Sequence, residues 1–350
     1  MFSGLPFGYM FLFVMGTGSL LSISSVHWLS IWAGLEINLI GFLPLLIYQK
    51  NISESESAVK YFIVQALGSS FLIFGSLMAF SSSFTWDLYT SFHFSTLGFI
   101  VLSAGLCIKL GVFPFHYWLP GVMAGLSWFS CLLLATWQKL APLFLLLCLL
   151  ELNQSYAMIY MFCMVSAGSS LIGGFGGMNQ TQIRALLAYS SIGHLGWMVF
   201  AVLHSEWTMK MYLLIYILIS LSMFMSLWLS DSSPMKHINN LKTSTMMQSS
   251  IMLLLLSLGG LPPLLGFISK LLVIMISTKG PWLFIVFMLI MGSLMSLFYY
   301  LSLFFSFFLN TVKKQGLSNM NVNAAAVTTI NIFNIGGGVI ILMINLMNSV

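Results

Sequence analysis

The chain consists of long apolar stretches separated by short polar breaks. A helix rises about 1.5 Å per residue, so a membrane span needs about 20 apolar residues. The stretches between polar breaks predict eleven spans, over residues 5–24, 28–48, 58–80, 96–119, 124–150, 156–176, 184–203, 207–229, 249–277, 281–309 and 326–347. No segment between spans is long enough for a soluble domain. The pattern therefore predicts an all-α polytopic membrane protein with about eleven transmembrane helices in a single membrane domain, residues 1–350.

Two of the predicted spans contain residues that interrupt a helix. The fourth span carries Gly111 and Pro114, and Pro114 has no N–H to donate to the carbonyl of Leu110. The ninth span is interrupted by Gly259, Gly260, Pro262 and Pro263. Broken backbone at membrane depth persists only where protein or trapped water satisfies its polar groups. Paired broken helices in matching positions of two halves point to a transport site.

The order of the two breaks predicts two related halves of the chain. The fourth and ninth spans are five apart, so the repeat units would cover about residues 5–150 and 156–309, with 326–347 as an extra C-terminal helix. An odd number of crossings in each unit would invert the second copy relative to the first. Because the sequence shows no convincing residue-level repeat, this prediction depends on the position and chemistry of the breaks alone.

Composition agrees with a membrane protein and narrows the set of partners. Hydrophobic residues make up 59% of the 350 residues and charged residues only 5%, against about 25% in an ordinary soluble domain. The net charge of +5 comes from loop lysines, so we interpret it as topology information and expect no nucleic acid partner. The stretch Met1–Leu21 has no basic region ahead of its apolar residues, so we expect it to stay as a span. The cysteines lie in apolar runs without CxxC spacing, which favours buried hydrophobes over metal ligands.

The placement of basic residues predicts the orientation in the membrane. Connections after even-numbered spans, together with the start of the third span, hold most of them: Lys50, Lys60, Arg184, Lys236, Lys242, Lys313 and Lys314. Connections after odd-numbered spans hold fewer basic residues and several acids: Lys210, Lys279, Asp87, Glu151 and Glu206. The positive-inside rule then places the N-terminus on the basic side and the C-terminus on the opposite side.

A small set of ionisable groups lies inside the predicted spans. The deep ones are Glu36, Lys109, Lys139 and Lys270, and Lys60 lies near a span end. One acid does not balance three deep bases, so at least two lysines must be neutral part of the time or solvated by internal water. Burial favours the neutral form of a lysine and a nearby carboxylate favours the charged form, so Glu36 could load and unload Lys109. This chemistry is typical of a proton relay.

Each of these residues also has a structural interpretation, in which a charge pairs with a partner, snorkels to an interface or fixes helix packing. His116 and His194 could bridge lysines, or each could be a satisfied interior histidine. We expect Glu36 and Lys109 to approach within ion-pair or one-water distance, because an unpaired buried carboxylate would neutralise itself. Lys139 is the deep base for which we expect no helix break of its own.

Several motifs around these residues carry a resemblance to a known family. They are GLEINLIGFLPLL at Glu36, ESAVKYF at Lys60, IKLGVFPFHYWLP at Lys109, TWQKLAP at Lys139, SSIGHLGW at His194 and LSLGGLPPLLGF before Lys270. In this order and spacing they resemble the antiporter-like membrane subunits of respiratory complex I, NADH–ubiquinone oxidoreductase. The resemblance runs from about residue 20 to 275. The 25 methionines are similar to those of invertebrate mitochondrial gene products.

The resemblance implies a proton-translocating subunit that is coupled to NADH:ubiquinone oxidoreduction in other chains. In the family the motif glutamate pairs with the first lysine, and further lysines carry protons along a hydrated axis. Carried over to this sequence, those positions are Glu36, Lys109, Lys139 and Lys270, with Lys60, His116 and His194 as supports.

The resemblance also implies the partners and the location of the chain. Flavin, iron–sulfur clusters and ubiquinone would be bound by other subunits, with no cofactor and no metal in this chain. Partners would be the other membrane-arm subunits, especially neighbouring antiporter-like chains, and the lipid bilayer with cardiolipin. The location would be the mitochondrial inner membrane, with the N-terminus in the matrix and the C-terminus in the intermembrane space.

Two alternatives share many of these features. A free-standing cation–proton antiporter would use the same charges and breaks, but it would need acids to hold Na⁺ or K⁺ and this sequence has one deep carboxylate. A structural scaffold would use the charges only to lock helices together. Migration as part of a large complex argues against the free antiporter, and loss of pumping on charge neutralisation argues against the scaffold.

Overall fold

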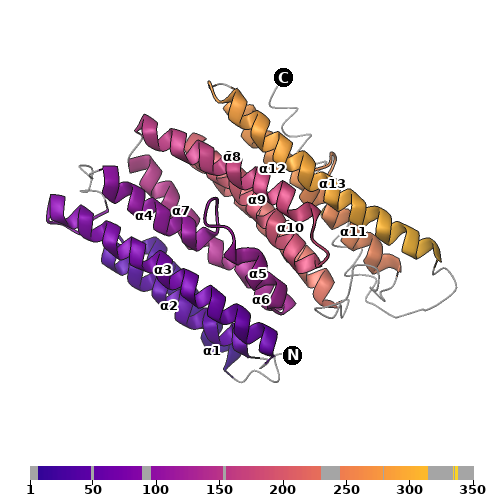
Figure 1. Ribbon diagram of the computed structural model, residues 1–350, viewed down its shortest axis with the longest axis horizontal. Coiled ribbons are helices and arrows are strands. Elements are labelled where there is room, and N and C mark those ends of the chain that lie inside the picture. The colour runs from indigo at the N-terminus through magenta and orange to yellow at the C-terminus, as the bar shows by residue number, and fades with distance from the viewer. Residues whose placement is uncertain are drawn as a thin grey trace. The chain divides into compact units, whose positions relative to one another are not determined.

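The structure, a computed structural model, describes residues 7–48, 51–88, 96–152, 155–229, 245–278, 280–313, 334, 336 and 337. These residues are helical apart from short connections and one isolated β-bridge between His27 and Asp87. The chain divides into two compact units, Met1–Met161 and Phe162–Val350. Figure 1 shows the helices of both units in chain order by colour.

The first unit contains the helices α1 to α7. They are α1 (Gly8–Ser24), α2 (Trp28–Ile47), α3 (Ile52–Ser83), α4 (Thr96–Leu110), α5 (Trp118–Gly125), α6 (Trp128–Ala135) and α7 (Trp137–Leu152). The helices α1, α2 and α3 run side by side at the indigo end of the chain (Figure 1). A Cβ atom added at Gly18 would lie 2.5 Å from the backbone nitrogen of Asn38, so only glycine lets α1 and α2 approach this closely. Close backbone approach at small residues is a main way in which helices associate in a membrane.

The second unit contains α9 to α13 and most of α8. These helices are α8 (Tyr156–Met178), α9 (Ile183–His204), α10 (Glu206–Leu229), α11 (Thr245–Gly259), α12 (Leu265–Ser277) and α13 (Leu283–Lys313). Small residues again set the packing, because a Cβ atom at Gly173 would lie 2.6 Å from the backbone nitrogen of Gly193 and one at Gly292 would lie 2.5 Å from the carbonyl carbon of Ser170. The helix α9 is buried along almost its whole length, so it forms the centre of this unit.

Within the described residues, seven helices are long and apolar enough to cross a membrane, which confirms a polytopic membrane protein. Helix length alone does not confirm the predicted number of eleven spans. The helix α1 has only 17 residues, and the fourth and ninth predicted spans are each divided into two shorter helices. The last predicted span, 326–347, lies almost wholly outside the described residues.

Some boundaries differ from the predicted ones for local reasons. The third span begins at Ile52 and not at 58, because the polar segment ESES is helical and forms part of the first turns of α3. The fourth span continues past residue 119 as α5 and ends at Gly125. The fifth span begins at Trp128 and not at 124, because Leu126 and Ser127 adopt extended backbone.

Candidate functional site: buried charges beside two helix breaks

The first helix break follows the last residue of α4, as predicted. Gly111 has a φ of 73°, a conformation that L-residues rarely adopt, and its N–H donates to the carbonyl of Cys107 over 3.0 Å. Protein side chains satisfy two carbonyls at the end of α4. The indole Nε1 of Trp118 donates to the carbonyl of Ile108 over 3.2 Å, and Gln65 Nε2 donates to that of Lys109 over 3.4 Å. The broken backbone is therefore held by neutral donors.

The second break has the same hydrogen-bond pattern as the first. Gly260 has a φ of 82°, and the N–H groups of Gly260 and Leu261 both donate to the carbonyl of Leu256, at 3.1 and 3.3 Å. At the first break the N–H groups of Gly111 and Val112 both donate to the carbonyl of Cys107 in the same way. This is the left-handed glycine ending that commonly terminates helices. Glycine chemistry thus produces both of the breaks that the sequence predicts.

The predicted pair of Glu36 and Lys109 is present. The Nζ of Lys109 lies 3.6 Å from Oε1 of Glu36, across the interior of the first unit. The Lys109 side chain is 3% exposed and that of Glu36 is 25% exposed. A partly exposed carboxylate therefore faces a fully buried ammonium.

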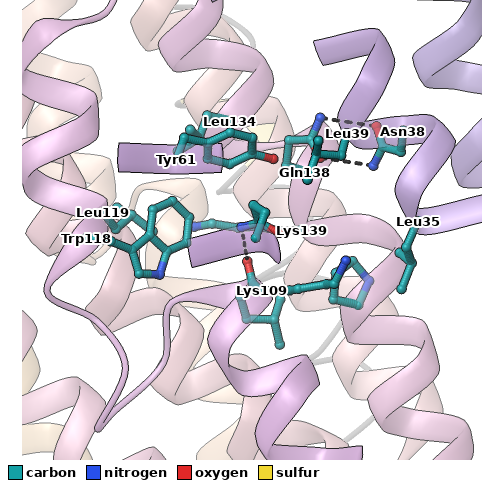
Figure 2. A pocket seen from close by; sticks show the side chains of 13 residues that line it. Leu35, Asn38, Leu39, Tyr61, Lys109, Trp118, Leu119, Leu134, Gln138 and Lys139 are labelled. Carbon is teal, nitrogen blue, oxygen red and sulfur yellow. Dashed lines mark hydrogen bonds between the residues drawn. The ribbon is translucent and has the colours of Figure 1, made fainter. Parts of the chain in front are cut away.

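A polar cavity connects the surroundings of Lys109 to those of Lys139 (Figure 2). The volume of the cavity that the centre of a water molecule can reach is about 20 Å³. A cavity needs about 10–15 Å³ by this measure to hold one water molecule. Its polar lining consists of Asn38, Tyr61, Gln65, Lys109, Trp118, Gln138 and Lys139. Leu35, Leu39, Leu110, Leu119, Leu134 and Pro142 complete the lining. The cavity can therefore hold water between two buried bases.

Lys139 lies beside a helix break, and the prediction that it has none is wrong. Thr136 separates α6 from α7, and its hydroxyl donates to the carbonyl of Leu132 over 2.7 Å. The N–H of Lys139 donates to the carbonyl of Thr136, three residues earlier, over 3.3 Å. Pro142 follows three residues later and has no N–H to donate. A threonine whose hydroxyl bonds the backbone of its own helix does not indicate a helix break in the sequence as clearly as glycine and proline do.

In the second unit, Lys270 contacts the broken helix itself. Its Nζ donates to the carbonyl of Gly259, the last residue of α11, over 2.9 Å. Cations are stabilised at helix C-termini because unsatisfied carbonyls point there. His194 lines a small cavity with Lys270, in which water centres can occupy about 10 Å³. The Nδ1 of His194 is hydrogen-bonded to the hydroxyl of Tyr212 at 2.9 Å.

The structure places two predicted support residues apart from both cavities. His116 is buried at 3% exposure, and its Nδ1 lies 3.2 Å from the carbonyl of Pro114 inside the break. Lys60 is exposed on α3, whereas its neighbour Tyr61 is buried and lines the first cavity. The geometry thus brings together Glu36, Lys109 and Lys139, and separately His194 and Lys270.

Sequence reasoning missed the amide side chains of the first site. Asn38 and Gln138 hydrogen-bond each other and line the cavity, and neither was a candidate. The available signal was their position inside apolar spans, because a buried amide needs a partner. Among the described residues no group of three His, Cys, Asp or Glu side chains could hold a metal ion, and the four cysteines, all described, form no disulfide.

Comparisons with known proteins agree with this arrangement. A family profile described as "NADH:quinone oxidoreductase/Mrp antiporter, TM" matches residues 25–296. The NADH-ubiquinone oxidoreductase chain 2 of Anopheles gambiae is 42% identical over 95% of this chain and 96% of its own length. The same chain of Lumbricus terrestris is 40% identical over 82% of this chain and 83% of its own length.

Solved structures show a similar fold. A chain of respiratory complex I from Thermus thermophilus superimposes with a TM-score of 0.80 and 25% identity, over 95% of this chain and 77% of that chain. A chain of the archaeal membrane-bound sulfane sulfur reductase has a TM-score of 0.85 at 19% identity, over 96% of this chain and 73% of that chain, which is a likeness of fold alone. Together with the paired breaks and buried charges, these matches show that the chain belongs to the NADH-ubiquinone oxidoreductase chain 2 family, within the wider family of NADH:quinone oxidoreductase and Mrp antiporter membrane subunits.

Proposed function

We propose that this chain, as a subunit of NADH:ubiquinone oxidoreductase, moves protons across the membrane through Glu36, Lys109, Lys139 and Lys270. In this proposal the redox chemistry takes place in other subunits, which would bind the flavin, the iron–sulfur clusters and the quinone. The observation that carries the proposal is the pairing of Glu36 with Lys109 beside a cavity that Lys139 also lines. A scaffold would need the ion pair but would have no use for a water-sized polar connection to a second buried base.

The relay in the first unit consists of proton transfers without any covalent change. While the Glu36 carboxylate lies beside Lys109, it stabilises the ammonium form. When this stabilisation is withdrawn, the Lys109 ammonium gives a proton to cavity water, and that water gives one to the neutral amine of Lys139. Lys109 ends as the neutral amine and Lys139 as the ammonium, so one positive charge has moved between the two residues.

The second unit carries a comparable set of groups. Lys270 would receive or give a proton through the cavity that His194 lines, since an imidazole can both accept and donate. The carbonyl of Gly259 would stabilise its ammonium form. His116 would act as a support at the first break, whereas for Lys60, which is exposed on α3, such a role is implied by the family resemblance alone.

Fold symmetry, location and partners complete the proposal. The identical hydrogen-bond pattern at Gly111 and Gly260 supports two repeated five-span units, and an odd number of crossings would invert one relative to the other. The proposed location is the mitochondrial inner membrane. There the distribution of basic residues supports an N-terminus in the matrix and a C-terminus in the intermembrane space. Neighbouring antiporter-like chains and cardiolipin are the proposed contacts.

Two substitutions of Lys139 test the relay in complex I reconstituted into sealed vesicles. Lys139→Met removes the charge and keeps the stem volume, so the complex should assemble but translocate fewer protons for each NADH oxidised. Lys139→Arg keeps a positive charge that arginine never gives up, so it should impair translocation as well. A structural lysine would tolerate arginine better than methionine. Full translocation in the arginine variant, at equal assembly, would refute the relay role.

A further inference from the structure

Asn38 of α2 and Gln138 of α7 form a reciprocal hydrogen-bonded pair inside the first unit (Figure 2). The Nδ2 of Asn38 donates to Oε1 of Gln138 over 2.9 Å, and Nε2 of Gln138 donates to Oδ1 of Asn38 over 3.1 Å. Each amide uses one N–H and one oxygen lone pair in this ring. One N–H and one lone pair therefore remain on each side chain for a further partner.

The remaining donors and acceptors lie in the right place to bind water. Asn38 and Gln138 both line the cavity that is shared by Lys109 and Lys139. A carboxamide does not titrate, so it cannot store a proton as the lysines do. Its chemistry suits it to hold a water molecule in one orientation by donating one hydrogen bond and accepting another.

The pair also links the segment that carries Lys139 to another helix. The backbone around Lys139 is weakly held by its own helix, because Thr136 breaks the helix before it and Pro142 removes a donor after it. Gln138, the adjacent residue, is tied to Asn38 across the unit. Asn38 is itself in a rigid place, because Gly18 of α1 packs directly against its backbone. The residue next to Lys139 is thus held by a contact to α2.

The same helix, α2, also contacts Lys109, the other base that lines the cavity. Its Glu36 lies 3.6 Å from the ammonium of Lys109, and its Asn38 holds the residue next to Lys139. We propose that Asn38 and Gln138 are positioning residues, which keep Lys139 at a fixed distance from Lys109 and orient the water through which a proton passes between them. This inference rests on the proposed relay function and adds two residues that do not themselves carry the proton.

An exchange of the two amides tests the pairing. Asn38→Gln lengthens one side chain by a methylene and Gln138→Asn shortens the other, so either single variant misplaces the pair. The double exchange, N38Q with Q138N, restores both amides and the summed length. A misplacement of about 1 Å can cost up to about 100-fold in rate, so we expect roughly a tenfold loss of proton flux per NADH oxidised in each single variant. The double exchange should recover most of this flux. Equal loss in the double and single variants would overturn the inference.

A second double variant separates positioning from packing. Asn38→Leu combined with Gln138→Met removes both polar partners together, which is close to neutral for stability because no buried group is left unsatisfied. The assembled complex should oxidise NADH with little proton flux. Normal flux in this variant would overturn the inference even if the single variants fail to assemble.

The Lys139→Met variant distinguishes failure of the inference from failure of the relay. If Lys139→Met translocates protons normally, the relay proposal and the inference both fail. If Lys139→Met loses flux and the N38L/Q138M variant does not, only the inference about the amide pair fails.

Discussion

The ammonium of Lys270 donates a hydrogen bond of 2.9 Å to the carbonyl of Gly259, the residue at which α11 ends. In the first unit the corresponding helix end is satisfied by the indole of Trp118 and the amide of Gln65, so Lys109 is available to Glu36. The two breaks share their backbone geometry but use their lysines differently. Lys109 faces a carboxylate, whereas Lys270 faces a carbonyl at the break itself.

Gly260→Ala should therefore disturb Lys270 directly. At a φ of 82° an alanine costs about 1–2 kcal/mol, and its Cβ would lie 3.0 Å from Nζ of Lys270. We expect a lower midpoint of thermal inactivation and a lower proton flux per NADH oxidised. Gly121→Ala is the matched control, because nothing lies within 4 Å of the added Cβ and the residue is helical. Equal behaviour of the two variants would contradict this account of the break.

Glu36→Gln should abolish the loading of Lys109. Glutamine keeps the size of the side chain but not the charge that stabilises the ammonium 3.6 Å away. A nearby opposite charge favours the charged form of a buried base by about tenfold or more, so a loss of about that size is expected in proton flux. Glu36→Asp keeps the charge on a shorter stem and should retain part of the flux. Wild-type flux in the glutamine variant at equal assembly would show that the pair is only structural.

Tyr212→Phe should act through His194. The substitution removes the hydroxyl that is hydrogen-bonded to Nδ1 of His194 at 2.9 Å, and such a bond contributes about 0.5–1.5 kcal/mol to stability. The imidazole would then lose a partner that fixes its orientation beside Lys270. Proton flux should therefore fall clearly, while the stability of the complex changes little. Tyr117→Phe is the control, because that side chain is 82% exposed. A proton flux unchanged by Tyr212→Phe would exclude an orienting role for this hydroxyl.

Lys60→Ala tests the resemblance against the geometry. The family resemblance implies a supporting role, whereas the structure places Lys60 exposed on α3, outside the cavity residues. From the geometry we expect proton flux close to that of the unmodified complex, while Tyr61→Phe, which alters the cavity lining, lowers it. The comparison uses vesicles with equal amounts of assembled complex. A large loss of flux in Lys60→Ala would show that a partner or lipid contact of Lys60 matters.

The sequence by itself determined the class of fold, the two broken helices and the identity of the buried charges. These features are local, because about 20 apolar residues make a span, and glycine and proline interrupt a helix through their own backbone chemistry. The break at Thr136 escaped this reasoning, since its hydroxyl competes for the helix backbone without any glycine or proline signal.

Only the tertiary structure decided which groups meet. Asn38 pairs with Gln138 across a separation of 100 residues, and Lys270 donates to the carbonyl of Gly259. Such partners depend on how closely helices approach and in which rotation, which is set by contacts such as Gly18 against Asn38. The sequence pattern shows that a buried polar group needs a partner. Packing between helices determines which partner it has.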